Sequence, residues 1–116
     1  MSVTLYHNPQ CSKSRATLQL LRDNGIEPRI IEYLKTPPSA GDLRHLAAAL
    51  GAHVRDLLRS GEPEFEELGL ADESLTEDRI LDAVAANPKL LQRPIVVAGG
   101  KARIGRPPEQ VLEILP

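Results

Sequence analysis

The chain has 116 residues, enough for one domain, and its 41% share of hydrophobic side chains argues against intrinsic disorder. Its 14 Lys and Arg against 16 Asp and Glu give a formal net charge of −2, so no basic excess favours nucleic acid. No apolar run is long enough to span a membrane and no signal sequence is apparent, and a single cysteine allows neither an internal disulfide nor a cysteine-rich zinc site. These features predict a cytoplasmic protein that binds no nucleic acid, membrane or metal, and the many charged side chains favour a monomer.

The first third of the chain predicts a strand, a helix and a second strand. A β-prone run at 2–6 ends in a turn at 7–9, and a helix begins around Cys11 and stops at residues 24–25. A second β-prone run covers 28–34. The short loops between these elements predict a βαβ unit with parallel strands and a right-handed crossover.

Helices are expected in the middle of the chain. Ser39 and Asp42 form a variant capping box, and apolar side chains follow at i, i+3, i+4 and i+7 as far as Leu50. Further turns are expected around 54–58, and another helix over 74–86.

A hairpin and a last helix end the chain. Residues 95–98 predict a buried strand. The two glycines that follow predict a hairpin turn, and residues 101–105 are expected to form the second, antiparallel strand. A last helix is expected from Pro107, with one apolar face formed by Val111, Leu112 and Leu115.

The order of these elements is βαβ, then helices, then ββα. This order matches the thioredoxin fold, in which a parallel half and an antiparallel half share one sheet. We therefore predict a single α/β domain over residues 1–116, with a four-stranded mixed sheet and a helical insertion over about 39–91.

Cys11 is the candidate nucleophile. It follows a strand and stands at the first turn of a helix, where unpaired N–H groups and the helix dipole favour a thiolate. His7, Lys13 and Arg15 are close in sequence and can add to this effect, and the hydroxyl of Ser14 can donate to the sulfur. The alternative, a buried structural cysteine, fits these polar neighbours less well.

Three arginines are candidates for binding an oxyanion: Arg59, Arg93 and Arg106. In a thioredoxin-like fold the loop before the third strand faces the first helix, so Arg93 is expected to point toward Cys11. A thiolate among guanidinium groups suits a tetrahedral oxyanion, whereas the alternative is that these are ordinary surface arginines.

Together these segments resemble the glutaredoxin-coupled arsenate reductase family, a branch of the thioredoxin fold, close to its less characterised arsenate reductase-like subgroup. The resemblance runs in order over nearly the whole chain. Its matching segments are Tyr6–Cys11 with Ser14-Arg15, Leu57–Arg59, Glu66–Leu70, Asn87-Pro88, Arg93–Val97 and Gly105–Leu112.

The resemblance implies a role for each matching residue. Cys11 attacks arsenic, His7 and Ser14 hold it as a thiolate, and Pro94 is the cis-proline of thioredoxin-like folds. The oxyanion and the arsenylated intermediate are bound by Arg59, Arg93 and Arg106.

The single cysteine predicts dependence on an external thiol, because reduction of arsenic(V) needs two electrons. The resemblance implies an oxidoreductase that reduces arsenate to arsenite, with glutathione as co-substrate, glutaredoxin as partner and no tightly bound cofactor. Two alternatives of the same fold are a monothiol redox or stress-sensing module and a partner-binding protein related to the RNA polymerase-binding branch. The three arginines favour the enzyme, since a sensor needs no oxyanion pocket.

Overall fold

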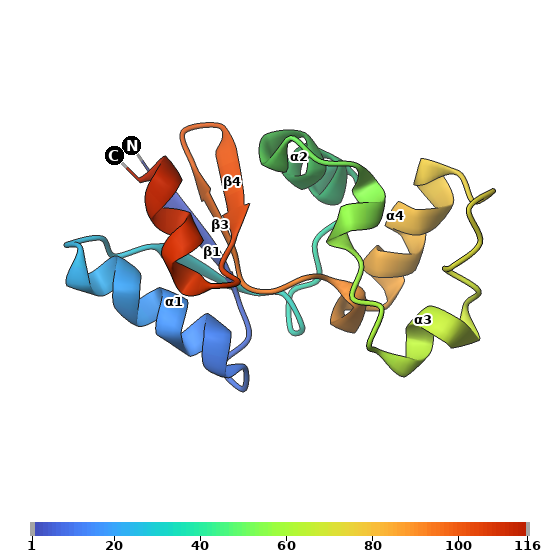
Figure 1. The fold of residues 1–116 in the computed structure, drawn as a ribbon, viewed down its shortest axis with the longest axis horizontal. Helices are drawn as coiled ribbons and strands as arrows, with labels where there is room; N and C mark the ends of the chain where they lie inside the picture. The colour runs from blue at the N-terminus through green and yellow to red at the C-terminus, as the bar shows by residue number, and fades with distance from the viewer. Residues whose placement is uncertain (1, 116) are drawn as a thin grey trace.

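A four-stranded mixed sheet organises the computed structural model, which describes residues 2–115 (Figure 1). β1 (Val3–His7) lies between β2 (Arg29–Glu32), to which it is parallel, and β3 (Ile95–Ala98), to which it is antiparallel. β4 (Lys101–Ile104) pairs antiparallel with β3 and gives the order β2-β1-β3-β4. The predicted mixed sheet with a thioredoxin-like order is confirmed.

Helices connect β1 to β2 and β2 to β3, and one further helix follows the last strand. α1 (Ser12–Asp23) joins β1 to β2, and the short helix η3 (Pro108–Ile114) follows β4. Between β2 and β3 lie α2 (Ala40–Leu50), η1 (Val54–Leu57), α3 (Pro63–Glu67), α4 (Glu77–Ala86) and η2 (Pro88–Leu90).

One core fills the space between the sheet, α1 and η3. Successive residues of a strand point to opposite faces, so Val3 and Leu5 of β1 share this side. They pack with Val96 and Ala98 of β3, Leu21 of α1, and Val111 and Ile114 of η3. Figure 1 shows α1 and η3 together on this side of the sheet.

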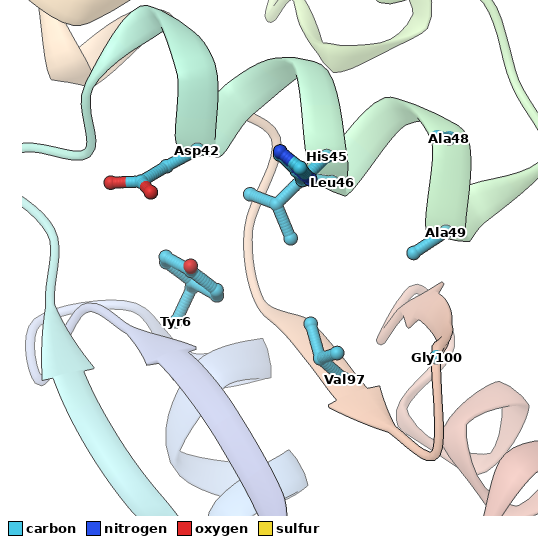
Figure 2. A pocket seen from close by; sticks show the side chains of 8 residues that line it. All are labelled: Tyr6, Asp42, His45, Leu46, Ala48, Ala49, Val97 and Gly100. Carbon is cyan, nitrogen blue, oxygen red and sulfur yellow. The ribbon is translucent and has the colours of Figure 1, made fainter.

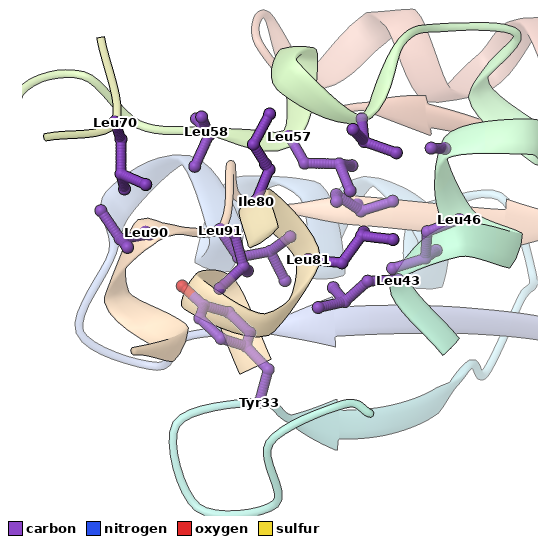
Figure 3. Close-up of a cluster of buried hydrophobic side chains, with 14 of the residues drawn as sticks. Tyr33, Leu43, Leu46, Leu57, Leu58, Leu70, Ile80, Leu81, Leu90 and Leu91 are labelled. Carbon is purple, nitrogen blue, oxygen red and sulfur yellow. The ribbon is translucent and has the colours of Figure 1, made fainter. Parts of the chain in front are cut away.

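A larger core lies on the opposite face and extends into the helical segment (Figure 3). Ile95 of β3 and Ala102 of β4 contribute from the sheet. Leucines dominate the remainder, including Leu43, Leu46, Leu57, Leu58, Leu81, Leu90 and Leu91. Tyr33, directly after β2, is fully buried in the same cluster.

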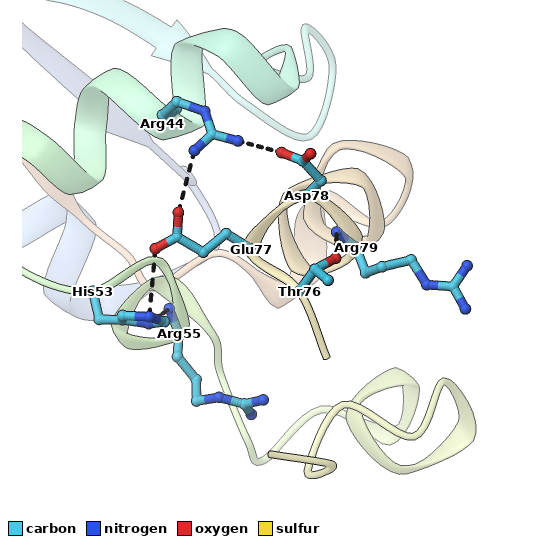
Figure 4. Close-up of polar contacts among 7 residues, drawn as sticks. All are labelled: Arg44, His53, Arg55, Thr76, Glu77, Asp78 and Arg79. Atoms are coloured by element: carbon cyan, nitrogen blue, oxygen red, sulfur yellow. Dashed lines mark hydrogen bonds and ion pairs between the residues drawn. The ribbon is translucent and has the colours of Figure 1, made fainter. Parts of the chain in front are cut away.

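The middle helices begin where local signals predict. Ser39 and Asp42 form the expected capping box at the start of α2, which ends at Gly51 in a left-handed conformation with φ of 67°. Arg44 of α2 binds Asp78 and Glu77 of α4, as Figure 4 shows. Such exposed ion pairs contribute little to stability, so the buried leucines hold these helices together.

Two expectations about the elements are wrong in detail, and the short helix α3 was not expected. β2 stops at Glu32, because its carbonyl accepts bonds from two following amides and the chain turns. α3 lacks any buried side chain and therefore has no apolar periodicity to reveal it. The last helix is of the 3₁₀ type, so its buried face repeats every three residues through Val111 and Ile114, while Leu112 is exposed.

Candidate active site

Cys11 is the N-cap of α1 and stands at the end of the loop that follows β1. Its amide donates to the Asn8 carbonyl at 3.0 Å, and its own carbonyl accepts from the amide of Arg15 at 3.0 Å. These two bonds fix the backbone on both sides of the cysteine. The thiol itself is only partly buried, so a substrate can reach it.

Beneath the cysteine, His7 and Ser14 form a buried polar pair. His7 Nδ1 lies 2.6 Å from the Ser14 hydroxyl, which also accepts from the amide of Asn8 at 3.0 Å. Both Ser14 and Asn8 are buried. This arrangement ties the loop to the first turn of α1.

The geometry revises the expected contributions of these two residues. The Ser14 hydroxyl is engaged with His7 and Asn8, so the serine acts on Cys11 through its backbone. Burial lowers the pKa of His7, and Arg22 and Arg15 lower it further against the opposing effect of Glu32. The lowered pKa favours the neutral ring, so His7 is a poor source of positive charge beside the thiol.

The pKa of Cys11 lies below its ordinary value. Burial acts in the opposite direction, but it is outweighed by the backbone N–H of Ser14, the guanidinium of Arg93 and the backbone N–H of Lys13. Amides at a helix N-terminus and an adjacent cation are the usual means of stabilising a thiolate. The site therefore presents a reactive sulfur.

The backbone brings the arginines together from three separate segments. The bridge between Leu58 and Leu91 aligns two loops, with the Arg59 amide donating to the Leu90 carbonyl at 2.7 Å. Arg106 reaches the same place from beyond β4, and its Nε donates to the carbonyl of Arg93 at 2.7 Å. The Arg93–Pro94 peptide bond is cis, as is Arg106–Pro107.

The guanidinium groups converge on the sulfur. Arg106 Nη2 lies 3.8 Å from Cys11 Sγ. Burial lowers the pKa of Arg59, and the neighbouring charges of Arg93 and Arg106 lower it further, as expected of like charges held close together. A hollow of about 170 Å³ is lined by Arg59, Ser60, Gly61, Gln92 and Arg106.

This cluster contains buried donors that lack partners. Among residues 2–115, Arg59 Nη1 and Arg93 Nε are buried without a hydrogen-bond partner. Such groups are unfavourable unless something pairs with them. An anion with several acceptor oxygens would satisfy them, which is the chemistry that a tetrahedral oxyanion offers.

Sequence reasoning missed two residues of the site. Glu62 Oε1 lies 3.7 Å from both Arg59 Nε and Arg93 Nη1. Tyr33 has a buried hydroxyl that finds no hydrogen-bond partner within residues 2–115, and the register of His7 with Glu32 puts this residue beside the cysteine loop. Neither position carries a recognised motif: the contact of Glu62 with Arg93, and the place of Tyr33 beside the cysteine loop, arise only when distant segments fold together.

A second hollow, of about 430 Å³, lies between α2 and the sheet (Figure 2). Asp42, His45 and Leu46 line it from α2, and Tyr6 and Val97 line it from the sheet. It shares no lining residue with the arginine hollow. The pKa of Tyr6 is raised by burial and by the nearby Asp42 carboxylate.

Residues 2–115 contain neither a cluster of metal ligands nor a membrane-spanning helix. No three side chains of the His, Cys, Asp and Glu types gather closely enough to hold a metal ion. No helix in this range combines the length and apolar character needed to cross a membrane.

Comparison with known proteins establishes the family of this thioredoxin-like thiol protein. The model of the ArsC family matches residues 6–114, and the chain belongs to that family. It is 58% identical over 114 residues to the uncharacterized protein YfgD of Escherichia coli K12, covering 97% of this chain and 96% of that protein. The resemblance drawn from the sequence is confirmed at the level of the family.

Relatives named for an activity are similar over the same range. An arsenate reductase of Escherichia coli K12 is 50% identical over 115 residues, covering 99% of this chain and 82% of the relative. The structure of an arsenate reductase from Vibrio cholerae has a TM-score of 0.97 and 54% identity, covering 99% of this chain and 98% of that one.

Proposed function

We propose that this chain is an arsenate reductase, an oxidoreductase that converts arsenate to arsenite with electrons from glutathione and glutaredoxin. One observation carries the proposal: an accessible thiol of lowered pKa faces guanidinium groups that hold unpartnered buried donors. The similarity to ArsC proteins named arsenate reductase points to the same substrate. We place the reaction in the cytoplasm, where glutathione keeps thiols reduced.

The first step joins arsenate to the protein. Arg59, Arg93 and Arg106 bind the oxygens of the anion and bring arsenic to the Cys11 sulfur. The thiolate attacks arsenic, an S–As bond forms, and one oxygen leaves as hydroxide, which takes a proton from solvent to become water. The adduct keeps the remaining oxygens on the guanidinium groups.

The second step moves two electrons to arsenic. A glutathione thiolate attacks the Cys11 sulfur of the adduct, a disulfide bond forms, and the S–As bond breaks with its electron pair on arsenic. Arsenic(V) becomes arsenic(III), and after protonation arsenite leaves. A glutaredoxin thiol then attacks the glutathione sulfur of the mixed disulfide and frees the Cys11 thiolate. With Cys11 as the single cysteine, these external thiols do the work that a second cysteine would do.

The test is a coupled assay in which NADPH consumption reports turnover with arsenate, glutathione, glutaredoxin and glutathione reductase. We expect saturable turnover for the unaltered protein and none for Cys11→Ser, with circular dichroism confirming that the variant is folded. Omission of glutathione should stop turnover. Rapid alkylation of Cys11 at pH 7 without arsenate turnover would instead favour a monothiol redox module that forms mixed disulfides.

A further inference from the structure

We infer that Glu62 sets the anion affinity of the arginine site, so that covalent capture by Cys11, rather than charge, selects the oxyanion. The inference rests on the proposed reduction of arsenate. It concerns a residue that contacts the arginines and has no part in the chemical steps above.

Glu62 lies among the arginines, and in the described part of the chain its carboxylate makes no other ion pair or hydrogen bond. It is the N-cap residue of α3, yet its side chain makes no capping hydrogen bond. Its Oε1 stands 3.7 Å from Arg59 Nε and 3.7 Å from Arg93 Nη1, and the three side chains are only 17–22% exposed. The carboxylate is therefore directed at the same guanidinium groups that the substrate would use.

The distance between the Glu62 carboxylate and the two guanidinium groups shows how Glu62 acts. A hydrogen-bonded N···O pair lies at about 2.7–3.2 Å, so a contact of 3.7 Å is an electrostatic one. The donors Arg59 Nη1 and Arg93 Nε remain without partners among residues 2–115. An oxyanion that binds to these guanidinium groups must therefore lie close to the negative charge of Glu62.

The charge balance has a consequence for selectivity. Three guanidinium groups, the Cys11 thiolate and the Glu62 carboxylate leave the site with one net positive charge, and without Glu62 it would have two. Phosphate and arsenate share shape and charge, so stronger anion binding would hold both equally well. Arsenate, however, exchanges its oxygens far more readily. A carboxylate that keeps reversible binding weak limits how much phosphate occupies the site, and the thiolate discriminates between the two anions by its reaction with arsenate.

Binding of inorganic phosphate tests this role without depending on turnover. The variant Glu62→Gln keeps the shape and removes the charge, and Glu62→Asp draws the charge back by one methylene group. Glu66→Gln is the matched control, because Glu66 is an exposed carboxylate on the same helix. Each substitution is placed on a Cys11→Ser background, and the Kd of phosphate is measured by calorimetry.

We expect Glu62→Gln to bind phosphate about three- to tenfold more tightly than its parent, Glu62→Asp to fall between them, and Glu66→Gln to match the parent. With Cys11 present, phosphate should inhibit arsenate reduction by Glu62→Gln at correspondingly lower concentrations. Unchanged or weaker phosphate binding by Glu62→Gln would overturn the inference and leave Glu62 as a support for the arginines.

The two proposals fail separately. If Glu62→Gln binds phosphate more tightly but the protein does not reduce arsenate, the proposed function is contradicted. The role of Glu62 in anion affinity is then still supported. If the protein reduces arsenate but Glu62→Gln does not change phosphate binding, the proposed function stands and the role of Glu62 is overturned. Calorimetry that detects no phosphate binding to any variant, Glu62→Gln included, also counts against the inference.

Discussion

Arg106 Nη2 lies 3.8 Å from Cys11 Sγ, although the two residues are 95 positions apart in the chain. The same side chain donates through Nε to the carbonyl of Arg93 at 2.7 Å. One guanidinium group thus connects the thiol to the loop before β3, and its planar shape lets it serve both partners at once. Lysine cannot reproduce this fork.

The first prediction concerns Arg106. Replacement by Ala should lower kcat/KM for arsenate by about 10–100-fold, because the oxyanion loses a charged donor next to the sulfur. Arg106→Lys should recover only part of this loss, since an ammonium cannot donate to Arg93 and to the substrate in the same geometry. Steady-state kinetics measure both variants, with Arg22→Ala as a control because Arg22 pairs with Glu27 on the exposed side of α1. Full activity in Arg106→Ala would remove this residue from the site.

The second prediction separates the groups that lower the pKa of Cys11. The backbone N–H groups and Arg93 act on the sulfur, whereas the Ser14 hydroxyl is bonded to His7 and Asn8. Arg93→Ala should therefore raise the thiol pKa more than Ser14→Ala does. The ultraviolet absorbance of the thiolate, followed against pH, gives each pKa.

Stability should respond in the opposite order to these two substitutions. Ser14→Ala leaves the buried amide of Asn8 without its acceptor, a loss worth about 1–3 kcal/mol. Arg93→Ala removes one of several like charges and should have the smaller effect on unfolding by urea. A thiol pKa that rises equally in both variants would mean that the Ser14 hydroxyl acts on the sulfur after all.

Local signals in the sequence predicted much of the fold. Ser39 and Asp42 identify the start of α2 because a capping box is made by residues three apart. The hairpin of β3 and β4 follows from two glycines directly after an apolar run, and both glycines have positive φ. Such features depend on neighbours in the chain, so the sequence displays them directly.

Features that depend on contacts between distant parts of the chain were harder to predict from the sequence. Glu62 is the N-cap residue of α3 and Tyr33 directly follows β2. Only the folded chain brings Glu62 beside Arg93 and Tyr33 beside the cysteine loop. α3 packs without a buried side chain and so leaves no periodic trace. The sequence likewise does not show that the Ser14 hydroxyl bonds to His7, because that contact depends on how β1 and α1 meet.

The third prediction is a loss of stability at mildly acidic pH that depends on His7. Burial lowers the pKa of His7 in the folded protein, so folding favours the neutral ring. This contribution is complete above the unfolded pKa of about 6.5 and is lost as pH falls through the lower folded value. Urea unfolding should therefore show stability declining below about pH 6.5.

His7→Asn isolates this effect, because its side-chain oxygen can still pair with Ser14 while the residue no longer titrates. The variant should lose less stability than the unaltered protein between neutral and mildly acidic pH. His45→Asn, at an exposed position of α2, serves as the control and should follow the unaltered protein. Parallel pH profiles for all three proteins would contradict the prediction.

The fourth prediction concerns the close approach of Gly105 to the base of the site. A Cβ atom at this position would lie 2.6 Å from Thr17 Oγ1 and 2.8 Å from Pro94 Cγ. Neither neighbour moves freely, since Thr17 is buried and donates to the Lys13 carbonyl at 2.8 Å, and Pro94 is a rigid ring whose carbonyl accepts from the Gly105 amide. Gly105→Ala should therefore destabilise the protein by about 1–3 kcal/mol through overpacking.

Urea unfolding of Gly105→Ala measures this effect directly. Gly61→Ala is the matched control, because its added Cβ meets no atom within 4 Å and its stability should stay close to that of the unaltered protein. Removing the nearer obstacle with Thr17→Ala should lessen the additional loss caused by Gly105→Ala, a coupling that a double-mutant cycle quantifies. Equal stability of Gly105→Ala and Gly61→Ala would show that α1 and the loop at Pro94 can move apart. The positions of Cys11 and Arg93 would then be less rigidly fixed than the packing of Thr17, Pro94 and Gly105 indicates.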